Sequence, residues 1–160
     1  MGLAEILKRS ELFVGLDDEA IRKITSLPSC QIRELGDQEV IFNGGDQASH
    51  LYVVAEGRVH LLLKFSEKDS GPQGESRWGV ITKGGVFGWG ALVPPHIRIG
   101  SAVSSGFSLI VSISGAELRE LFDKDTQLGY EVMKGLVKII SSRVWNIERL
   151  LATGKRSPFI

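Results

Sequence analysis

The residues best suited to chemistry lie between Phe87 and Arg98. Gly88 and Gly90 fall in one short run there, and a backbone without Cβ atoms lets a ligand approach closely. A helical turn beginning at this run would present free N–H groups to an anion. Arg98 adds a guanidinium that can donate two parallel hydrogen bonds to phosphate oxygens. The pattern predicts an anion-binding turn, unless the glycines only turn the chain and Arg98 is a surface arginine.

The elements that hold this run are predicted to be short strands. Turn residues recur about every 10–14 positions between Cys30 and Ile113, and no helical pattern interrupts them. The turn signals are Gly44-Gly45-Asp46, Glu56-Gly57, Gly71-Pro72, Gly84-Gly85, Pro94-Pro95 and Ser104-Ser105-Gly106. The β-rich runs are 40–42, 51–54, 59–65, 78–82 and 107–113. The spacing predicts an antiparallel barrel or sandwich over residues 29–113, with an exposed hairpin loop at 66–77.

Helical patterns flank the strands on both sides. Residues 1–28 carry apolar positions at helix spacing, and Pro28 ends the second of two short helices. Ser114 and Glu117 have capping-box spacing at the start of helices over 114–152, which are followed by a short tail, 153–160. The last helix, about Thr126 to Leu151, has two apolar stripes. One stripe is predicted to pack on the barrel and the other to pair with a second copy, the alternative being that the chain's own core covers both.

The stripe predicted to form this homodimer contains Val137, Ile140, Val144, Ile147 and Leu151.

Composition narrows the class of protein. The 160 residues suit one domain, and 19 basic against 19 acidic residues give no global reason to bind nucleic acid or an anionic membrane. Cys30 is the single cysteine, so an internal disulfide is excluded. No apolar run approaches the length of a membrane span, and the N-terminus lacks a secretory pattern. We therefore expect a single cytoplasmic domain without a membrane anchor.

The order of these motifs resembles the cyclic nucleotide-binding domain family, as in catabolite activators and protein kinase A regulatory subunits. The first half of the resemblance is carried by Gly36-Asp37, Gly45-Asp46, Leu51-Tyr52-Val53-Val54 and Gly57-Arg58-Val59. The second half is carried by the run 87–92, similar to the family's Phe-Gly-Glu-x-Ala-Leu, and by Arg98 at the family's arginine position. The resemblance covers about residues 12–152 and implies a double-stranded β-helix (jelly-roll) barrel with flanking α-helices.

The resemblance also implies a ligand site in the barrel, at the family's phosphate-binding cassette. Its members here are Phe87, Gly88, Trp89, Gly90, Ala91, Arg98, Ile99 and Gly100. The implied ligand is cyclic AMP or cyclic GMP. Trp89 stands where the family has a glutamate that accepts a hydrogen bond from the ribose 2′-hydroxyl, and an indole has no acceptor. Ile99 and Gly100 likewise stand where a small hydroxyl residue is usual, so a different or weaker anionic ligand is favoured.

Three orientations of Trp89 follow from this departure. Its indole fills the ribose position and blocks the cavity, turns outward to stack on a base, or lines a pocket for another anion. In related regulators the long C-terminal helix also touches the base, and Ser141, Ser142 and Arg143 are the polar candidates for that contact here.

Three functions remain to be compared. The first is a homodimeric ligand-sensing regulatory module, not an enzyme, that signals through the C-terminal helix. With about nine residues after Leu151, we expect no DNA-binding domain and no direct contact with nucleic acid. The second is a degenerate, ligand-free barrel used for dimerisation or protein interaction. The third, a cupin-type metal barrel using His50, His60, His96 and Glu56, is disfavoured because no His-x-His pair is present.

Overall fold

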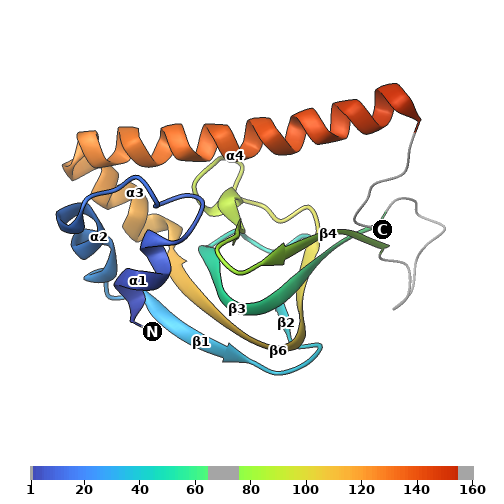
Figure 1. Ribbon diagram of the computed structural model, residues 1–160, viewed down its shortest axis with the longest axis horizontal. Helices are drawn as coiled ribbons and strands as arrows, with labels where there is room; N and C mark the ends of the chain where they lie inside the picture. Colours follow the sequence, from blue (N-terminus) through green and yellow to red (C-terminus); the bar gives the residue numbers. More distant parts are fainter. Residues whose placement is uncertain (1, 65–75, 155–160) are drawn as a thin grey trace.

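The computed structural model describes residues 2–64 and 76–154, in which antiparallel strands form a barrel flanked by helices (Figure 1). The strands are β1 (Gln31–Leu35), β2 (Val40–Phe42), β3 (His50–Leu63), β4 (Ser76–Thr82), β5 (Val86–Phe87) and β6 (Ser101–Ser114). Their order is β1-β6-β3-β4, with β2 also paired to β6 and β5 also paired to β3. The helices are α1 (Leu3–Lys8), α2 (Asp18–Thr25), α3 (Gly115–Lys124) and α4 (Thr126–Thr153). A 3₁₀ turn, η2 (Trp89–Ala91), lies between β5 and β6. This arrangement confirms the predicted jelly-roll barrel with N-terminal helices and a long C-terminal helix.

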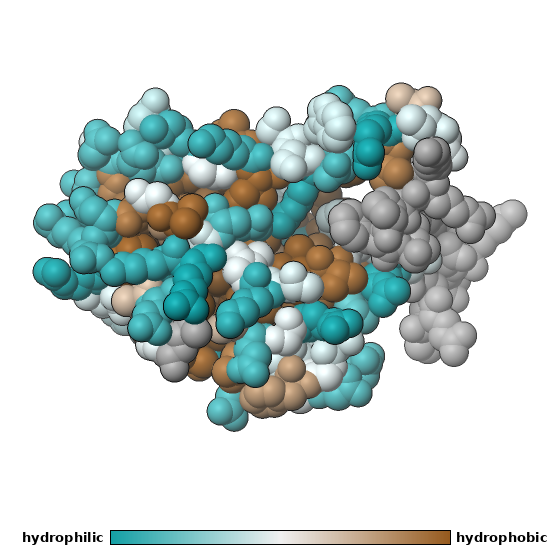
Figure 2. Space-filling model, viewed as in Figure 1, coloured by the Kyte–Doolittle hydropathy of each residue, from teal (hydrophilic) through white to brown (hydrophobic). Residues whose placement is uncertain are grey.

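Two cores form because successive side chains of a strand point to opposite faces. In β3, Leu51 and Val53 face a helix core that includes residues of α1, α2, α3 and α4. Tyr52 and Val54 face the barrel core, which also contains Phe87. Figure 1 shows α4 running along one side of the barrel, with α1, α2 and α3 near its N-terminal half. Figure 2 shows apolar side chains between the polar ones on this face of the molecule.

Two predicted turns are wrong, because β3 and β6 run straight through them. Gly57 has φ +84° and lies where the β3–β6 register shifts between Glu56 and Arg58. Gly106, in β6, has φ +73°. An isolated glycine inside a strand marks a bulge as well as a turn, and here the barrel needs the bulge in order to curve. The predicted hairpin loop 66–77 lies mostly outside the described residues, and Ser76 and Arg77 begin β4.

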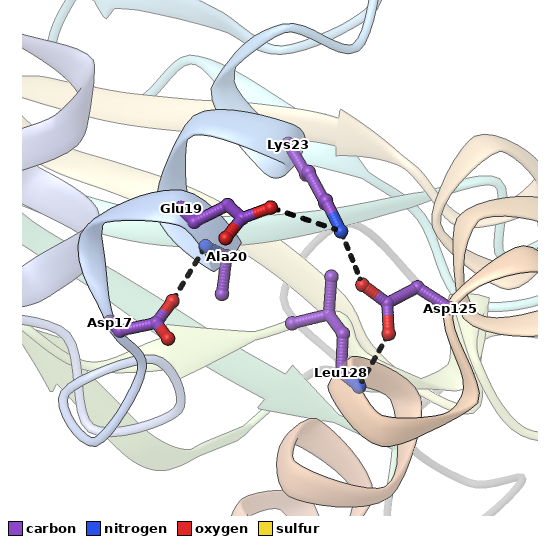
Figure 3. Close-up of polar contacts among 6 residues, drawn as sticks. All are labelled: Asp17, Glu19, Ala20, Lys23, Asp125 and Leu128. Atoms are coloured by element: carbon purple, nitrogen blue, oxygen red, sulfur yellow. Dashed lines mark hydrogen bonds and ion pairs between the residues drawn. The ribbon is translucent and has the colours of Figure 1, made fainter.

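Side-chain caps fix where the helices begin. Asp17 accepts a hydrogen bond from Ala20 N–H at 2.8 Å, and Asp125 accepts one from Leu128 N–H at 3.1 Å (Figure 3). The other oxygen of Asp125 lies 2.7 Å from Lys23 Nζ, so the start of α4 is tied to α2. The hydrogen bond to Lys23 holds the pKa of the Asp125 carboxyl below its usual range, and the bond to Leu128 acts in the same direction.

Only half of the predicted capping box forms at α3. Ser114 Oγ accepts a hydrogen bond from Glu117 N–H at 3.2 Å. The Glu117 carboxylate accepts from Ser29 N–H at 3.1 Å, while Ser114 N–H donates to Ser29 Oγ at 2.8 Å. Two hydrogen bonds of Ser29 therefore link the segment before β1 to the start of α3. None of the helices within residues 2–64 and 76–154 is both long and apolar enough to span a membrane.

Candidate functional site

The turn η2 follows β5, whose Phe87 is buried in the barrel core. Gly88 begins the turn with φ +75°. A Cβ atom on Gly88 would lie 2.9 Å from Tyr52 Cδ2 and 3.1 Å from Arg98 Nη1, so both the backbone and the space require glycine. Gly90 is less constrained, since its Cβ would meet Ala48 Cβ at 3.4 Å. The predicted anion-binding turn is therefore built tightly around Gly88.

Arg98 turns inward beneath this turn and is only 6% exposed, so it is not a surface arginine. Its Nη1 donates to the Gly88 carbonyl at 2.8 Å, and its Nη2 donates to the His50 carbonyl at 2.6 Å. Its Nε is buried and has no hydrogen-bond partner among the described residues. The Nε–H group is thus left for an acceptor that the described residues do not supply.

The charge on Arg98 is buried without a matching carboxylate. No ion pair of the described residues includes Arg98, and the Asp46 carboxylate accepts from Asn43 N–H at 2.9 Å instead. Burial lowers the pKa of Arg98, and Tyr52 and Asp46 oppose this effect. The guanidinium carbon lies 4.1 Å from the centre of the Phe42 ring, a cation–π contact. Because an unpaired buried charge is costly, an anion bound here would be stabilised strongly.

Two backbone donors lie at the start of the same turn. Ala91 and Leu92 donate to the carbonyls of Gly88 and Trp89 at 3.2 and 3.0 Å, which defines one turn of helix. The N–H groups of Trp89 and Gly90 take part in none of the hydrogen bonds found among the described residues. First-turn N–H groups together with a guanidinium are the donor set that suits a phosphate.

Trp89 points away from the barrel core. Its indole is half-buried against the helix core, whereas the rings of Phe42 and Tyr52 pack in the barrel core with centroids 6.0 Å apart. The indole therefore does not fill the barrel, and the turn carries no carboxylate to accept a hydrogen bond from a sugar hydroxyl.

Some of the other predicted site residues lie near Arg98, and others point away from it. Gly88 lies against Arg98, Phe87 is buried in the barrel core, and Ala91 is fully buried as the last residue of η2. The side chain of Ile99 is 89% exposed and so points away from the buried guanidinium. Gly100 packs against β3, where a Cβ would collide with the Leu62 carbonyl.

Sequence reasoning missed three contributors to the site, which are Phe42, Tyr52 and the carbonyl of His50. Tyr52 stacks on Phe87 with ring centroids 5.0 Å apart, and Phe42 lies 6.3 Å from Phe87. A signal for Tyr52 was present, because it alternates with Leu51 and Val53 along a strand. A backbone carbonyl has no sequence signal, so the acceptor at His50 could not be found.

A cavity of about 300 Å³ lies between β4 and α4. Leu61, Trp78 and Ile81, which belong to or pack against the barrel core, line it from the barrel side. Ser142 and Arg143, two of the three residues predicted to contact a base, line it from α4. Ser141 instead lines a groove on another side of α4.

Arg143 also ties α4 to the strand that leads into the turn. Its Nη2 donates to the Val86 carbonyl at 2.9 Å and lies 3.3 Å from Glu11 Oε1. The same Glu11 oxygen accepts from Val86 N–H at 2.9 Å. Burial lowers the pKa of Arg143, and Glu11 opposes the shift. Both polar groups of Val86 are therefore held by residues outside the sheet.

The three histidines lie apart from one another. His50 Nδ1 lies 2.8 Å from Ser49 Oγ, His60 Nε2 lies 3.4 Å from Arg77, and His96 Nδ1 lies 2.8 Å from the Gly90 carbonyl. In the part of the chain that the structure describes, no group of three His, Cys, Asp or Glu side chains is arranged to hold a metal ion.

Known proteins share this architecture. A protein of Geobacter metallireducens GS-15 is 25% identical, with a TM-score of 0.74 over 90% of this chain and 99% of its own. A cyclic nucleotide-binding domain of Methylobacillus flagellatus is 20% identical, with a TM-score of 0.77 over 94% and 82%. The catabolite activator protein of Thermus thermophilus is 24% identical, with a TM-score of 0.73 over 90% of this chain and 62% of its own.

No curated protein sequence matches the chain significantly. The family model of the cyclic nucleotide-binding domain matches residues 32–125, which include the turn and Arg98. Because this match covers more than half of the chain, the protein belongs to the cyclic nucleotide-binding domain family.

Proposed function

We propose that the protein is a regulatory, non-catalytic module that binds a small anion at Arg98 and passes the binding event to α4. The observation that carries this proposal is the buried guanidinium of Arg98, which has a partnerless Nε and no carboxylate counter-charge. Family membership and a catabolite activator among the structural neighbours support a regulatory role.

Phosphate and sugar fit this site differently. The guanidinium and the N–H groups of Trp89 and Gly90 suit a phosphodiester. The cavity between β4 and α4 offers Trp78, Ile81 and Arg143 to an aromatic base. The turn, however, has no carboxylate for a ribose 2′-hydroxyl, since Trp89 packs against the helix core. We therefore propose a cyclic nucleotide, or another phosphate-bearing ligand, that is bound without recognition of that hydroxyl.

We predict that cyclic AMP and 2′-deoxy cyclic AMP bind with dissociation constants within about twofold of each other. A hydrogen bond from the hydroxyl to a charged acceptor would contribute about 1.5–3 kcal/mol, which is roughly a tenfold to hundredfold preference. Calorimetric titration of both nucleotides at the same salt concentration measures the ratio. A tenfold or larger preference for cyclic AMP would contradict this account of Trp89.

Coupling to α4 would use the contacts at Val86. Arg143 and Glu11 hold the carbonyl and the N–H of Val86, three residues before Trp89. A shift of the turn on binding would therefore be felt at Arg143. Such coupling requires that the anion bind one arrangement of α4 better than the other.

We further propose that α4 forms a homodimer. Val137, Val144, Ile147 and Leu151 are 64%, 45%, 48% and 79% exposed, although single-chain helices normally bury such a stripe. Ile140, also predicted in this interface, is half-buried and packs partly on the chain's own helix core. A groove of about 340 Å³ that a second α4 would fill is lined by three of the predicted interface residues, Val137, Ile140 and Val144, together with Ser141, Trp145 and Glu148.

The double variant Val137→Glu/Val144→Glu is expected to be a folded monomer. Two carboxylates buried in the interface would weaken association by about a hundredfold or more. Sedimentation velocity reports the mass, and circular dichroism reports the fold. Thr126→Glu/Gln127→Glu adds the same charge at exposed positions in the first turn of α4 and should remain a dimer. A wild-type monomer, or an unchanged mass in the interface variant, would overturn the proposed dimer.

One observation favours a second function. The rings of Phe42, Tyr52 and Phe87 stack closely in the barrel core, beside Arg98. If these rings do not move apart, the barrel is ligand-free and serves only in dimerisation or protein interaction. Absence of binding by cyclic AMP and cyclic GMP, with the dimer retained, would favour this alternative.

A further inference from the structure

Three carbonyl groups at the η2 turn, those of Gly88, Gly90 and Ala91, each contact a side chain from outside the turn. Gly88 accepts from Arg98, as described above. The Gly90 carbonyl lies 2.8 Å from His96 Nδ1, and the Ala91 carbonyl accepts from Arg119 Nη1 of α3 at 2.8 Å. His96 has φ +58°, a conformation that non-glycine residues adopt rarely and at a cost. The fold maintains this strained residue at the end of the segment that follows the turn.

The contacts of His96 define its tautomer. A carbonyl oxygen only accepts, so Nδ1 must carry the proton that is donated to Gly90. In a neutral imidazole the other nitrogen, Nε2, is then an acceptor. Arg119 Nη1 lies 3.0 Å from Nε2 and 3.3 Å from Nδ1, so it sits over the face of the ring rather than in line with the Nε2 lone pair. A guanidinium over the ring face favours neutral His96, because a protonated ring would place two positive charges against each other.

We propose that His96 and Arg119 are positioning residues that hold the η2 turn in its anion-binding shape, and that they do so only while His96 is neutral. The proposal rests on the function proposed for the turn. A proton on Nε2 would place a second positive charge against the Arg119 guanidinium. Arg119 would then move away from the ring and release the Ala91 carbonyl, and the turn would loosen.

Ala91 is placed to transmit this change. It is fully buried, and a Cβ atom on Gly115, the first residue of α3, would collide with its carbonyl oxygen. The turn and the start of α3 therefore touch without an intervening side chain, which brings Arg119 within reach of the carbonyl. A change in charge at His96 acts on this contact directly.

The other charged groups near His96 are engaged elsewhere. The segment 43–48 packs against it through Ala48 N–H, which donates to the His96 carbonyl at 2.6 Å. Asp46 of that segment accepts from Asn43 N–H, and Arg98 donates to Gly88 and His50. On α3, Glu117 accepts from Ser29 N–H. Arg119 is thus the charged group whose contact depends on the protonation of His96.

Amide hydrogen exchange of the ligand-free protein tests the proposal. Leu92 and Val93 donate their N–H groups into the turn, to Trp89 and Gly90, and so report its opening. His96→Asn is the matched variant, because asparagine tolerates positive φ, donates to Gly90 through its amide and does not titrate. Exchange is measured in both proteins at about pH 8 and about pH 5.5, which bracket the histidine transition.

At the higher pH the ratio of exchange rates between the two proteins sets the reference, since asparagine keeps the donor to Gly90 but not the ring that Arg119 contacts. At the lower pH, that ratio for Leu92 and Val93 should move about fivefold toward faster exchange in the wild type, the effect of losing one hydrogen bond. The comparison cancels the intrinsic pH dependence of exchange and the titration of His50 and His60, which both proteins share. A ratio that stays the same at both pH values would overturn the proposal.

The nitrogen-15 spectrum of the His96 ring gives a second readout. The proposal requires proton-bearing Nδ1 and bare Nε2 at the higher pH, and the opposite tautomer would refute it. Neither measurement needs a ligand. Failure of cyclic AMP to bind would therefore count against the proposed function alone, whereas pH-independent exchange would count against the role of His96 and Arg119.

Discussion

Replacing Arg98 with methionine is expected to remove binding of cyclic AMP while leaving the barrel folded. The guanidinium is buried beneath the turn, and a charged hydrogen bond to phosphate contributes about 1.5–3 kcal/mol or more. Affinity should fall at least tenfold to a hundredfold. Any stabilisation by the nucleotide in a thermal melt should vanish with it.

Stability without ligand should change little in Arg98→Met. The variant loses hydrogen bonds to the carbonyls of Gly88 and His50, which costs about 1 kcal/mol each. It also removes a buried charge that has no carboxylate partner, and this offsets the loss. The unbranched side chain of methionine can still pack against Phe42.

Arg58→Met is the matched control, because Arg58 is an exposed arginine on β3, away from the turn. It should bind cyclic AMP as the wild type does. Equal stabilisation by cyclic AMP of Arg98→Met and wild type would show that the nucleotide binds elsewhere.

Gly88→Ala is expected to be both less stable and unable to bind. A φ of +75° costs a non-glycine residue about 1–2 kcal/mol. The new Cβ would also press on Tyr52 and on Arg98 Nη1, so the guanidinium and the turn must move apart. Thermal unfolding with and without cyclic AMP measures both effects.

Gly106→Ala separates the cost of the backbone from the crowding at the site. Gly106 has a closely similar φ of +73°, and a Cβ there would meet nothing within 4 Å. This variant should lose about 1–2 kcal/mol of stability but keep its response to cyclic AMP. If Gly88→Ala also kept that response, the close packing of Gly88 on Arg98 would not matter for binding.

The proximity of Gly88 and Arg98 was predictable, but the hydrogen bonds of Arg98 were not, and binding of an anion at this turn stays a prediction. Glycines at 88 and 90 and an arginine at 98 indicate an anion-binding turn because each residue type has a direct chemical reason to be there. The partners of Arg98 are carbonyls of Gly88 and His50, and every residue has a carbonyl. The contact between His96 and Arg119 was also hidden, because it joins a loop to a helix that begins some twenty residues later.

The fold shows the same division. Regularly spaced turn residues and the β-rich runs between them identified most strands, and the apolar stripes identified α4. Glycine at 57 and 106 indicates a turn in the sequence but lies inside a strand, since some turns and some bulges both use glycine at positive φ and only the strand pairing distinguishes them. Trp89 packs against the helix core rather than the barrel core. Which of the two cores has room for an indole depends on side chains from many elements, so the residues near Trp89 in the sequence do not predict its direction.

The exposed stripe of α4 has a consequence for signalling. Val144 belongs to the proposed dimer interface, and its neighbour Arg143 contacts Val86 next to the turn. In the proposed dimer, one helix would carry both the contact to the proposed ligand turn and the contact to a second copy. A small shift at Val86 would then reach the partner copy through α4.

We propose that the buried guanidinium of Arg98, which has no carboxylate partner among the described residues, makes this barrel an anion sensor. The decisive experiment is calorimetric titration of the wild type and Arg98→Met with cyclic AMP at low and moderate salt. We expect saturable binding of one nucleotide per chain in the wild type and none in Arg98→Met. Absence of heat with the wild type, or the same isotherm for both proteins, would contradict it.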